Sequence, residues 1–259
     1  MLVAQVLAAV ERLAPPSLAE EWDNVGLIVG RHNQPVRRLL VALELRSDVL
    51  GEAREHGCDA ILTHHPPIFP SIASVTDGAA GELVLRAAED RLAVMAAHTN
   101  LDAARGGLND VMAEILGMST AVPLRPDPDM PSCGLGRIGT VRAMTLSALA
   151  EAAGWGFDGA PVSYAGDPWV QVRRVACCSG SGASLIDDAR AAEADAFVTS
   201  DLKYHDADRA GGLPLVHLPH ARVERVAMKR WSRVLGKAVA SQGVEVRFAE
   251  TETDPWQVA

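Results

Sequence analysis

Short apolar runs alternate along this chain with longer segments in which apolar residues recur every three or four positions. The short runs are rich in β-branched residues and are often bounded by Gly, Pro or Asp, a pattern that predicts strands. They lie at residues 25–30, 37–43, 59–64, 91–98, 161–166, 172–178, 195–200, 213–219 and 244–250. Segments 47–57 and 183–194 have the helical period and lie between strands. The alternation predicts an α/β fold with βαβ crossovers.

The pattern repeats once along the chain. Residues 36–65 align without a gap with residues 172–201, and Gly30 and Gly166 close the preceding strand in the same register. Ala-rich helices align easily by chance, so identity alone is weak evidence for a repeat. The identical pairs are Val36/Val172, Arg37/Arg173, Arg38/Arg174, Ala53/Ala189, Arg54/Arg190, Asp59/Asp195, Ala60/Ala196 and Thr63/Thr199.

A second feature supports the repeat. In each half the next strand leads to a histidine and, four positions later, an acid, at His98 and Asp102 and again at His220 and Glu224. We therefore expect two similar α/β lobes that face each other across a pseudo-twofold axis. A site in the cleft between such lobes would take ligands from both.

The boundary between the lobes is predicted from a proline-rich, loop-like passage at residues 123–136. We place the first lobe at residues 1–125 and the second at residues 126–224.

Composition limits the class of protein. Asp and Glu outnumber Lys and Arg by 33 to 24, the net charge is −9, and no basic cluster resembles a phosphate-binding patch, so nucleic acid is not an expected partner. The N-terminal segment predicts an amphipathic helix rather than a signal peptide, and no apolar run is long enough to span a bilayer. The four cysteines lack the spacing of a disulfide framework. We expect a soluble, cytoplasmic protein with no membrane partner.

The sharpest chemical signal is the pair His64 and His65, which ends an apolar strand and precedes Pro66 and Pro67. Adjacent side chains of a strand point to opposite faces, so one metal ion cannot easily take both, whereas two ions can. Open α/β sheets place ligand sites at the carboxyl ends of their strands. The alternative is a surface loop with two incidental histidines.

The two His-x3-acid motifs are weaker when each is taken alone. If a helix begins near Ala221, His220 and Glu224 lie on one helical face, close enough to reach one metal ion, but they could equally form a solvated pair. Asp102, four residues after His98, could be a metal ligand or a residue that starts a helix or turn.

Together these residues form a set with the composition of a metal site. The set supplies three imidazoles and two carboxylates, and with one bridging carboxylate it could hold two divalent ions. Such a mixture of N and O donors suits Zn, Fe, Mn, Co or Ni better than Ca or Mg. Its members are His64, His65, Asp102, His220 and Glu224.

The segment that follows the second-lobe strand offers further candidates. Asp201 takes the place in the repeat that His65 has in the first lobe, so this strand end should face the same cleft. Lys203 and His205 could then contact substrate or carry protons. The alternative is a charged surface turn.

Other motifs give weaker evidence for a functional site. GLGRIG at 134–139 matches a dinucleotide-binding pattern by letter, but it follows a proline-rich loop and continues into a strand. GSG at 180–182 could bind an anion or form a tight turn. Cys177 and Cys178 are expected to pack in a strand core. Aromatic residues make up 4% of the chain, from which we expect no aromatic platform for a purine.

Several segments occur in the order found in one known family. They are EEWDNVGLIVG, ILTHHPPIF, AAHTNLDAARGGLND, GSGASLIDDARAAEADAFVTSDLKYHDA, the His-x3-Glu after a strand, and the ending VEVRFAETETDPW. In these the chain resembles, over nearly its whole length, the Nif-three-like dinuclear metal-centre family, whose members are often named GTP cyclohydrolase 1 type 2 homologues. One departure is TSD at 199–201, where the family usually has TGE or similar. That difference concerns substrate contacts rather than metals.

The resemblance implies a short, two-lobe form with a dinuclear metal site in the cleft between the lobes. His64 and His220 would hold one ion, His65 and Asp102 the other, and Glu224 would bridge the two.

The resemblance also implies how the chain completes its fold and assembles. The first lobe would be completed by residues from about 225 to 259, and the subunits would form a toroidal homohexamer.

The activity implied by the name is the metal-dependent hydrolytic opening of a purine ring, with His98 or His205 moving protons. We therefore expect a metal-dependent hydrolase that acts on a nucleotide-like small molecule. The alternative is a non-catalytic metal-binding, metal-delivery or regulatory scaffold protein. Proton carriers such as His98, Lys203 and His205 would be superfluous in a storage protein and favour the enzyme.

Overall fold

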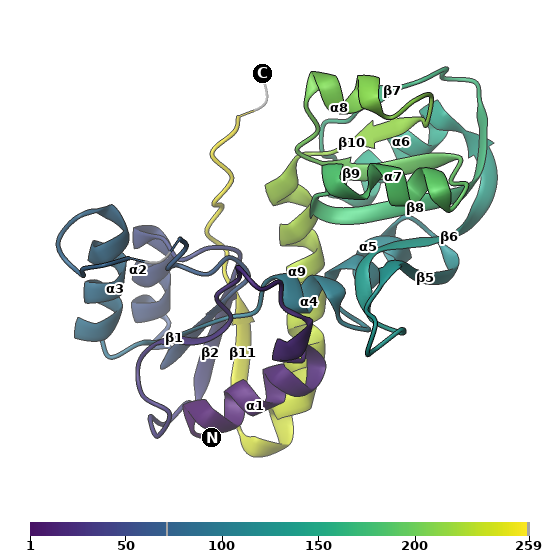
Figure 1. Ribbon diagram of the computed structural model, residues 1–259. Helices are drawn as coiled ribbons and strands as arrows, with labels where there is room; N and C mark the ends of the chain where they lie inside the picture. The colour runs from purple at the N-terminus through teal and green to yellow at the C-terminus, as the bar shows by residue number, and fades with distance from the viewer. Residues whose placement is uncertain (71, 258–259) are drawn as a thin grey trace. The chain divides into compact units, whose positions relative to one another are not determined.

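The chain forms two compact units, each built on one β-sheet, in a computed structural model that describes residues 1–70 and 72–257 (Figure 1). Unit 1 comprises Met1–Leu101 and Met228–Pro255. Unit 2 comprises Asp102–Ala227 together with Trp256 and Gln257. The division expected from the sequence, near residue 125, thus differs from the observed one between Leu101 and Asp102. The reason is that the helix Leu108–Ile115 packs on the second sheet and the strand Ser119–Pro126 pairs within it.

The five-stranded sheet of unit 1 has the order β1-β4-β3-β2-β11. Strands β4, β3, β2 and β11 pair in parallel, and the edge strand β1 is antiparallel to β4. Parallel neighbours bring their carboxyl ends to one edge of the sheet. The strands are β1 (Gly26–Val29), β2 (Arg38–Ala42), β3 (Ala60–Thr63), β4 (Ala93–Ala96) and β11 (Glu245–Phe248).

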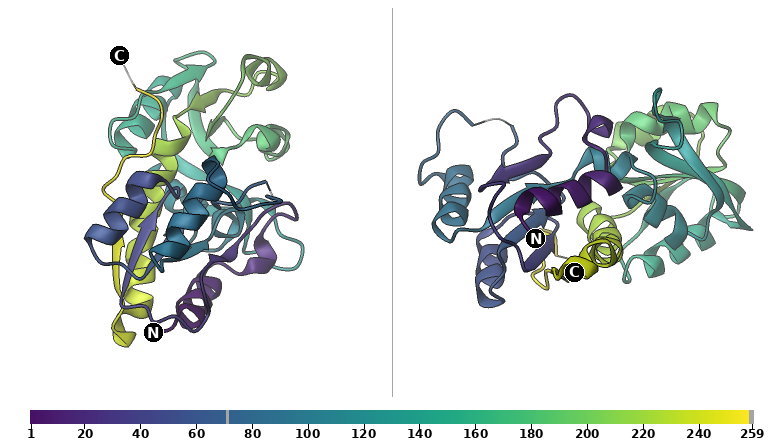
Figure 2. Two further views of the ribbon diagram at one scale, coloured as in Figure 1. Left: turned by 90° about the vertical axis from the view of Figure 1, so that its left-hand side faces the viewer. Right: turned by 90° about the horizontal axis from the view of Figure 1, so that it is seen from below.

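Helices cover both faces of this sheet (Figures 1 and 2). On one face, α2 and α3 pack their apolar sides on a core that includes Leu40, Leu50 and Ile61. On the other lie α1 and the C-terminal part of α9. The apolar residues of α1 recur at helical spacing, as at Val3 and Val6, and are buried, each contributing about 1.5–3 kcal/mol. The helices are α1 (Val3–Leu13), α2 (Ser47–Glu55), α3 (Ala79–Glu89), α4 (Thr99–Ala103) and α9 (His220–Val239).

The six-stranded sheet of unit 2 has the order β5-β6-β8-β9-β10-β7. Strands β8, β9 and β10 pair in parallel, while β7 is antiparallel to β10 and β6 is antiparallel to both β5 and β8. The strands are β5 (Ser119–Pro126), β6 (Gly134–Thr145), β7 (Ser163–Ala165), β8 (Gln171–Ser181), β9 (Ala196–Ser200) and β10 (Leu215–His217).

Two sets of helices sandwich the second sheet. One core joins α5 and α6 to residues such as Val175 and Val198, and the other joins α7 and α8 to residues such as Ala176 and Phe197. Successive residues of β8 and β9 therefore point to opposite cores, as the strand period requires. The helices are α5 (Leu108–Ile115), α6 (Leu146–Gly156), α7 (Ile186–Ala191) and α8 (Tyr204–Arg209). Short 3-10 turns lie at Pro16–Leu18, Ala183–Leu185 and Ala240–Gln242.

Corresponding hydrogen bonds in each unit support the repeat seen in the sequence. A carboxylate oxygen of Asp59 accepts the amides of Arg37 and Arg38 at 2.7 and 3.0 Å. In unit 2 the same oxygen of Asp195 accepts the two equivalent amides at 2.8 and 2.7 Å. Both units thus tie the residue that precedes one strand to two amides near the amino end of its parallel neighbour.

The proline-rich passage expected to separate the lobes instead forms a hairpin. Its residues belong to the end of β5, the turn and the beginning of β6, which pair antiparallel from Ser119 opposite Thr140 to Pro126 opposite Gly134. Prolines are tolerated there because β5 is an edge strand, whose outward-facing groups need no partner.

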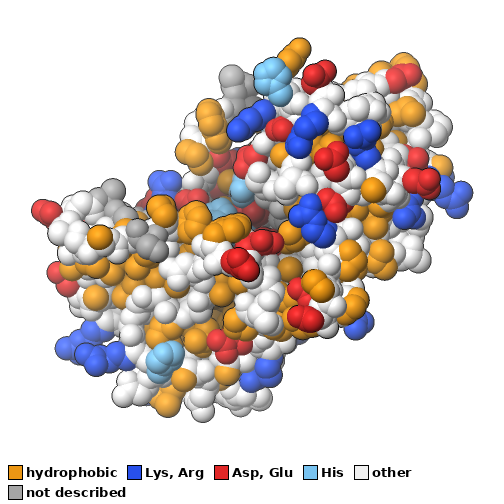
Figure 3. All heavy atoms as spheres, viewed as in Figure 1, with side chains coloured by type: hydrophobic (Ala, Val, Ile, Leu, Met, Phe, Trp, Pro, Cys, Tyr) orange, Lys and Arg blue, Asp and Glu red, His pale blue; other side chains and the backbone are white. Residues whose placement is uncertain are grey.

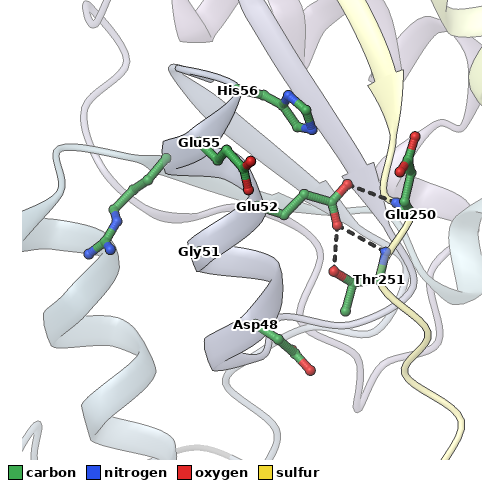
Figure 4. A pocket seen from close by; sticks show the side chains of 8 residues that line it. Asp48, Gly51, Glu52, Glu55, His56, Glu250 and Thr251 are labelled. Atoms are coloured by element: carbon green, nitrogen blue, oxygen red, sulfur yellow. Dashed lines mark hydrogen bonds between the residues drawn. The ribbon is translucent and has the colours of Figure 1, made fainter.

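The C-terminal segment after β11 is fastened to α2. One carboxylate oxygen of Glu52 accepts the amide of Glu250 at 2.7 Å, and the other accepts the amide and the hydroxyl of Thr251 at 3.0 and 2.5 Å (Figure 4). Arg46 also donates to the carbonyl oxygen of Thr253 at 3.2 Å. This segment therefore has a defined place beside α2.

Surface charge and cysteines agree with the composition. Basic and acidic side chains are interspersed on the face shown in Figure 3. The four cysteines are free thiols in buried positions. Burial raises the pKa of Cys177 to about 12 and raises that of Cys178 as well, so both thiols stay protonated in the core, as expected. No helix among the residues described here is long and apolar enough to cross a membrane.

Candidate metal centre

Three histidines gather at one edge of the unit 1 sheet. His64 and His65 follow β3, and His98 follows β4, its parallel neighbour, in which Ala96 pairs with Thr63. Their ring centroids are 5.1 to 5.4 Å apart. One nitrogen from each ring lies within 4.8 Å of the other two, so the three could hold a metal ion.

The Nδ1 atom of each imidazole faces an oxygen acceptor. For His64 the acceptor is the carbonyl oxygen of Ala97 at 2.9 Å, and for His65 it is Oε1 of Glu44 at 3.2 Å. Carbonyl and carboxylate oxygens only accept, so each Nδ1 carries the proton, and Nε2 is left as the basic nitrogen that binds metals. This oriented tautomer is typical of metal-ligating histidines.

The adjacent pair His64 and His65 lies beyond the strand itself. Strand β3 ends at Thr63, and the amides of both histidines donate to the carbonyl oxygen of Leu43, at 3.2 and 2.9 Å. Their rings are inclined by 39°. The alternation of a regular strand no longer applies here, and the assignment of the two rings to different ions stays a prediction.

The acceptor for His98 is Asp23, whose Oδ1 lies 2.8 Å from Nδ1. The Asp23 side chain is fully buried, and its other oxygen accepts the amide of Thr99 at 3.0 Å and the Thr99 hydroxyl. Burial alone would raise the pKa of Asp23, but the hydrogen bonds from His98 and Thr99 and the charge of His98 lower it to about 2. The carboxylate is therefore ionised and fixes the His98 ring.

Sequence reasoning missed both carboxylates that orient these rings. Asp23 lies in the segment EEWDNVGLIVG, one of the segments that carry the family resemblance, and Glu44 follows β2. The one available signal was the position of Glu44 at the carboxyl end of a predicted strand beside the strand of His65.

Unit 2 places His220 and Glu224 one turn apart at the beginning of α9, as the spacing predicted. His220 Nε2 lies 2.8 Å from Oε1 of Glu224, and His220 Nδ1 lies 2.6 Å from Oδ2 of Asp201. Burial would lower the pKa of the imidazole, but the hydrogen bonds and charges of Glu224 and Asp201 raise the pKa of His220 to about 9. The two carboxylates therefore favour the protonated form of His220.

Asp201, expected as a substrate contact, lies at the end of β9 and orients His220. Its backbone has a φ of 54°, a conformation that Asp adopts more readily than most residues. A role in substrate binding stays a prediction. The observed contact resembles the one that Asp23 makes with His98.

A glycine of β8 makes room for the acid of this pair. A Cβ atom added to Gly180 would lie 2.5 Å from Oε1 of Glu224 and 3.3 Å from Nε2 of His220, and its φ is +66°. Of the two earlier interpretations of GSG, the tight turn and the anion site, neither describes this role. Gly180 allows Glu224, which is 2% exposed, to approach the backbone.

Asp102 is anchored through a buried asparagine. The side chain of Asn109 donates to the carbonyl oxygen of Asp102 at 3.0 Å and accepts the amide of Ser179 at 2.8 Å. Ser179 adjoins Gly180, whose backbone the Glu224 carboxylate approaches. Unit 2 thus gathers three of the predicted ligands around the end of β8.

Lys203 and His205 are exposed on and beside α8. The Lys203 amide donates to Asp206 at 2.9 Å, and the His205 ring stacks edge-on against Tyr204 with centroids 5.2 Å apart. Their expected roles in substrate contact and proton transfer stay predictions.

The donor set fits a divalent transition metal. Unit 1 offers three imidazoles with basic Nε2 atoms, and unit 2 offers an imidazole, the buried carboxylate of Glu224 and the partly buried one of Asp102. Nitrogen and carboxylate donors without thiolates suit Zn, Fe, Mn, Co and Ni.

Comparison with known proteins gives a consistent result. A sequence model of the Duf34/NIF3 (NGG1p interacting factor 3) family matches residues 1–255. The chain is 34% identical over 265 residues, covering 98% of this chain and 93% of the relative, to a Streptomyces coelicolor protein named GTP cyclohydrolase 1 type 2 homolog. A Clostridium perfringens protein of the same name is 30% identical over 261 residues and covers 99% of each chain. The crystal structure of a Bacillus cereus protein related to NIF3 superposes with a TM-score of 0.93 at 25% identity, covering 100% of this chain and 99% of the other.

Proposed function

Because the chain belongs to the Duf34/NIF3 family, we propose that it is a dinuclear metal-binding protein and a metal-dependent hydrolase of a nucleotide-like small molecule. The observation that carries the proposal is the group of oriented imidazoles at His64, His65 and His98, which could hold a metal ion. Relatives named GTP cyclohydrolase 1 type 2 homolog support the hydrolytic class.

In this proposal the metal ligands of unit 1 would be His64 and His65. Those of unit 2 would be Asp102, His220 and Glu224, and the five side chains have the donor composition for two divalent ions. Each unit supports its own part: oriented rings in unit 1, and closely spaced His220 and Glu224 in unit 2.

Divalent ions bound by these residues would supply Lewis acidity toward water and toward an electrophilic group of the substrate. The chain itself supplies orientation and a proton acceptor. Asp23 holds the proton of His98 on Nδ1, so Nε2 can accept a proton, and the carboxylate stabilises the imidazolium that results. His98 therefore serves as the proton carrier of the proposed hydrolysis, with His205 as a second candidate.

The test measures metal content and turnover on the same protein. Metals are counted by mass spectrometry of purified protein, and hydrolysis of GTP and other nucleotides is followed by chromatography. His65→Ala and Glu224→Ala should lose most of one metal equivalent and all turnover, whereas His32→Ala, an exposed histidine of unit 1, should lose neither. Wild-type protein that binds no metal contradicts the metal site, and metal-loaded protein that consumes no nucleotide contradicts the hydrolase.

The alternative function is metal delivery or a regulatory scaffold. Lys203 and His205 are exposed, which favours this alternative because an enzyme would hold its proton carriers in fixed positions. Among the candidates in the described residues, His98 alone is held by a buried carboxylate. A delivery protein would lose its metal to a chelator within minutes, stay folded, take the metal up again and turn over no substrate. Metal that leaves only when the protein unfolds would contradict delivery.

We also propose, by family resemblance, that the subunits assemble into a homohexamer. Analytical ultracentrifugation at micromolar concentration measures this directly, and a monomer would contradict it.

A further inference from the structure

Two large aromatic side chains are exposed on unit 1. Trp22 is 55% exposed and Phe69 is 51% exposed. Their ring centroids lie 5.5 Å apart with an interplanar angle of 57°. Other aromatic side chains of the chain are exposed as well, such as Trp155 and Trp169, but these two rings are in contact and form a contiguous apolar patch of the kind found at ligand-binding sites.

Hydrogen bonds hold the loops that carry this pair. The side chain of Asn24 donates to the carbonyl oxygen of Ile68 at 2.8 Å, which joins the residues next to the two rings. Asp23, adjacent to Trp22, accepts the Asn24 amide at 2.8 Å as well as the His98 ring. The exposed rings therefore stand on a fixed backbone.

The pair lies beside the imidazole cluster. The Trp22 and His98 ring centroids are 6.0 Å apart at 72°, and His98 in turn lies 5.2 Å from His64. If one end of a small molecule is bound at the histidines, a ring attached to that end can reach the Trp22 side chain.

We propose that Trp22 and Phe69 form a stacking subsite for a planar heteroaromatic ring, such as a nucleobase, in a ligand whose polar group is bound at the imidazole cluster. This inference rests on the proposed function and specifies the substrate class of the same site. Stacking of a base on an aromatic side chain contributes about 1–3 kcal/mol and tolerates any base, because every base has a π face.

The low aromatic content of the chain predicts no aromatic platform for a purine, and the proposed stacking subsite differs from that expectation. The percentage counts residues and says nothing of their placement: Trp22 and Phe69 are far apart in sequence and are brought together by the fold. The orientation of Trp22 toward His98 also depends on Asp23, which binds the ring that Trp22 contacts.

The test compares a ligand that has a base with one that lacks it. Binding of guanosine 5′-monophosphate and of ribose 5-phosphate to the zinc-treated full chain is measured by isothermal titration calorimetry. The expected result is that Trp22→Ala weakens binding of the nucleotide about tenfold or more and leaves ribose 5-phosphate unchanged. Trp22→Phe should recover most of the loss, and Phe69→Leu should weaken the nucleotide to a smaller extent.

Trp169→Ala is the matched control, since Trp169 is 74% exposed on unit 2 and should have no effect. Zinc content and turnover are measured on the same samples. Equal binding of the nucleotide by wild type and Trp22→Ala overturns the subsite, as does wild-type protein that prefers ribose 5-phosphate. A Trp22→Ala protein that changes oligomeric state and keeps its nucleotide affinity assigns the surface to a second copy of the chain and also overturns it. Nucleotide binding without zinc uptake or turnover contradicts the proposed function and leaves the subsite standing.

Discussion

The Nδ1 atom of His98 lies 2.8 Å from Oδ1 of Asp23, a carboxylate whose side chain is fully buried. The same carboxylate accepts the amide of Thr99, the residue after His98. One side chain therefore fixes both the ring and the backbone of the histidine, and it does so across 75 positions of sequence.

Replacing Asp23 with Asn should weaken the fold and lower the proposed turnover. The neutral amide cannot match the ionised carboxylate as an acceptor, so the free energy of unfolding should fall by about 1.5–3 kcal/mol. Loss of the carboxylate that orients His98, the proposed proton carrier, should lower turnover by about 10- to 100-fold and leave the metal content unchanged. Denaturant unfolding, chromatography of the nucleotide products and mass spectrometry of bound metal measure these effects. Glu55→Gln, an exposed acid of α2, is the control. Unchanged turnover in Asp23→Asn would show that the His98 ring is oriented by another contact.

Gly180→Ala should displace Glu224. The added methyl group would lie 2.5 Å from the Glu224 carboxylate, and the φ of +66° adds a backbone penalty of about 1 kcal/mol or more. Gly212→Ala carries a similar backbone penalty, at a φ of +91°, but nothing lies within 4 Å of its Cβ. Both variants should lose stability, and only Gly180→Ala should also lose a metal equivalent by mass spectrometry. Equal metal content in the two variants would refute the steric argument.

Glu52→Gln should loosen the C-terminal segment in a pH-dependent way. Burial would raise the pKa of Glu52, but hydrogen bonds from Thr251 and from the Glu250 amide lower it below the ordinary glutamate value. A depressed pKa stabilises the fold above the unfolded pKa, near 4.3, and this contribution disappears as the pH falls through the folded pKa. The variant should be less stable at pH 7 by about 1 kcal/mol or less, because the carboxyl is partly solvated.

The measurement for Glu52→Gln is denaturant unfolding at pH 7 and at pH 3, with Glu55→Gln as control. The difference from wild type should be present at pH 7 and should be smaller at pH 3, because protonation of Glu52 removes the charge that the variant lacks. A difference of the same size at both pH values would mean that the charge of Glu52 has no part in holding Glu250 and Thr251.

The repeat predicts matched effects in the two units. Asp59→Ala removes the acceptor of two amides in unit 1, and Asp195→Ala removes the equivalent acceptor in unit 2. Each should destabilise its unit by about 1–3 kcal/mol. Amide hydrogen exchange should rise in β2 and β3 for the first variant and in β8 and β9 for the second. Asp208→Ala, exposed on α8, should change neither. An effect in one unit only would show that the two carboxylates are not equivalent.

The sequence was sufficient for the elements whose pattern is local. Strands β1 to β4, β7 and β9 to β11 lie within the predicted runs, and β8 (Gln171–Ser181) extends beyond its run of residues 172–178 at both ends. Helix α9 begins at His220, next to the expected Ala221. The hairpin of β5 and β6 was not predicted, because prolines such as Pro123 and glycines such as Gly134 are typical of loops. Pairing of β6 with β8 overrides that local preference, and such pairing between distant segments is not encoded in either segment alone.

The candidate site could be predicted as far as its imidazoles and acids, but not their partners. His64 and His65 can be recognised in the sequence because they directly follow an apolar run. Asp23 and Trp22, by contrast, act on His98 from another part of the chain, and contacts of that range leave no periodic trace. Such partners are found only once the strands have been placed side by side.

The three imidazoles of unit 1 are the same residue type with three different acceptors at Nδ1. His64 faces a neutral carbonyl, His65 a partly exposed carboxylate, and His98 a fully buried one. A negative acceptor makes Nε2 more electron-rich, and a buried one does so with less screening by water. The three rings therefore lie in three different electrostatic surroundings, so exchanging their positions would change the chemistry of the cluster without changing its composition.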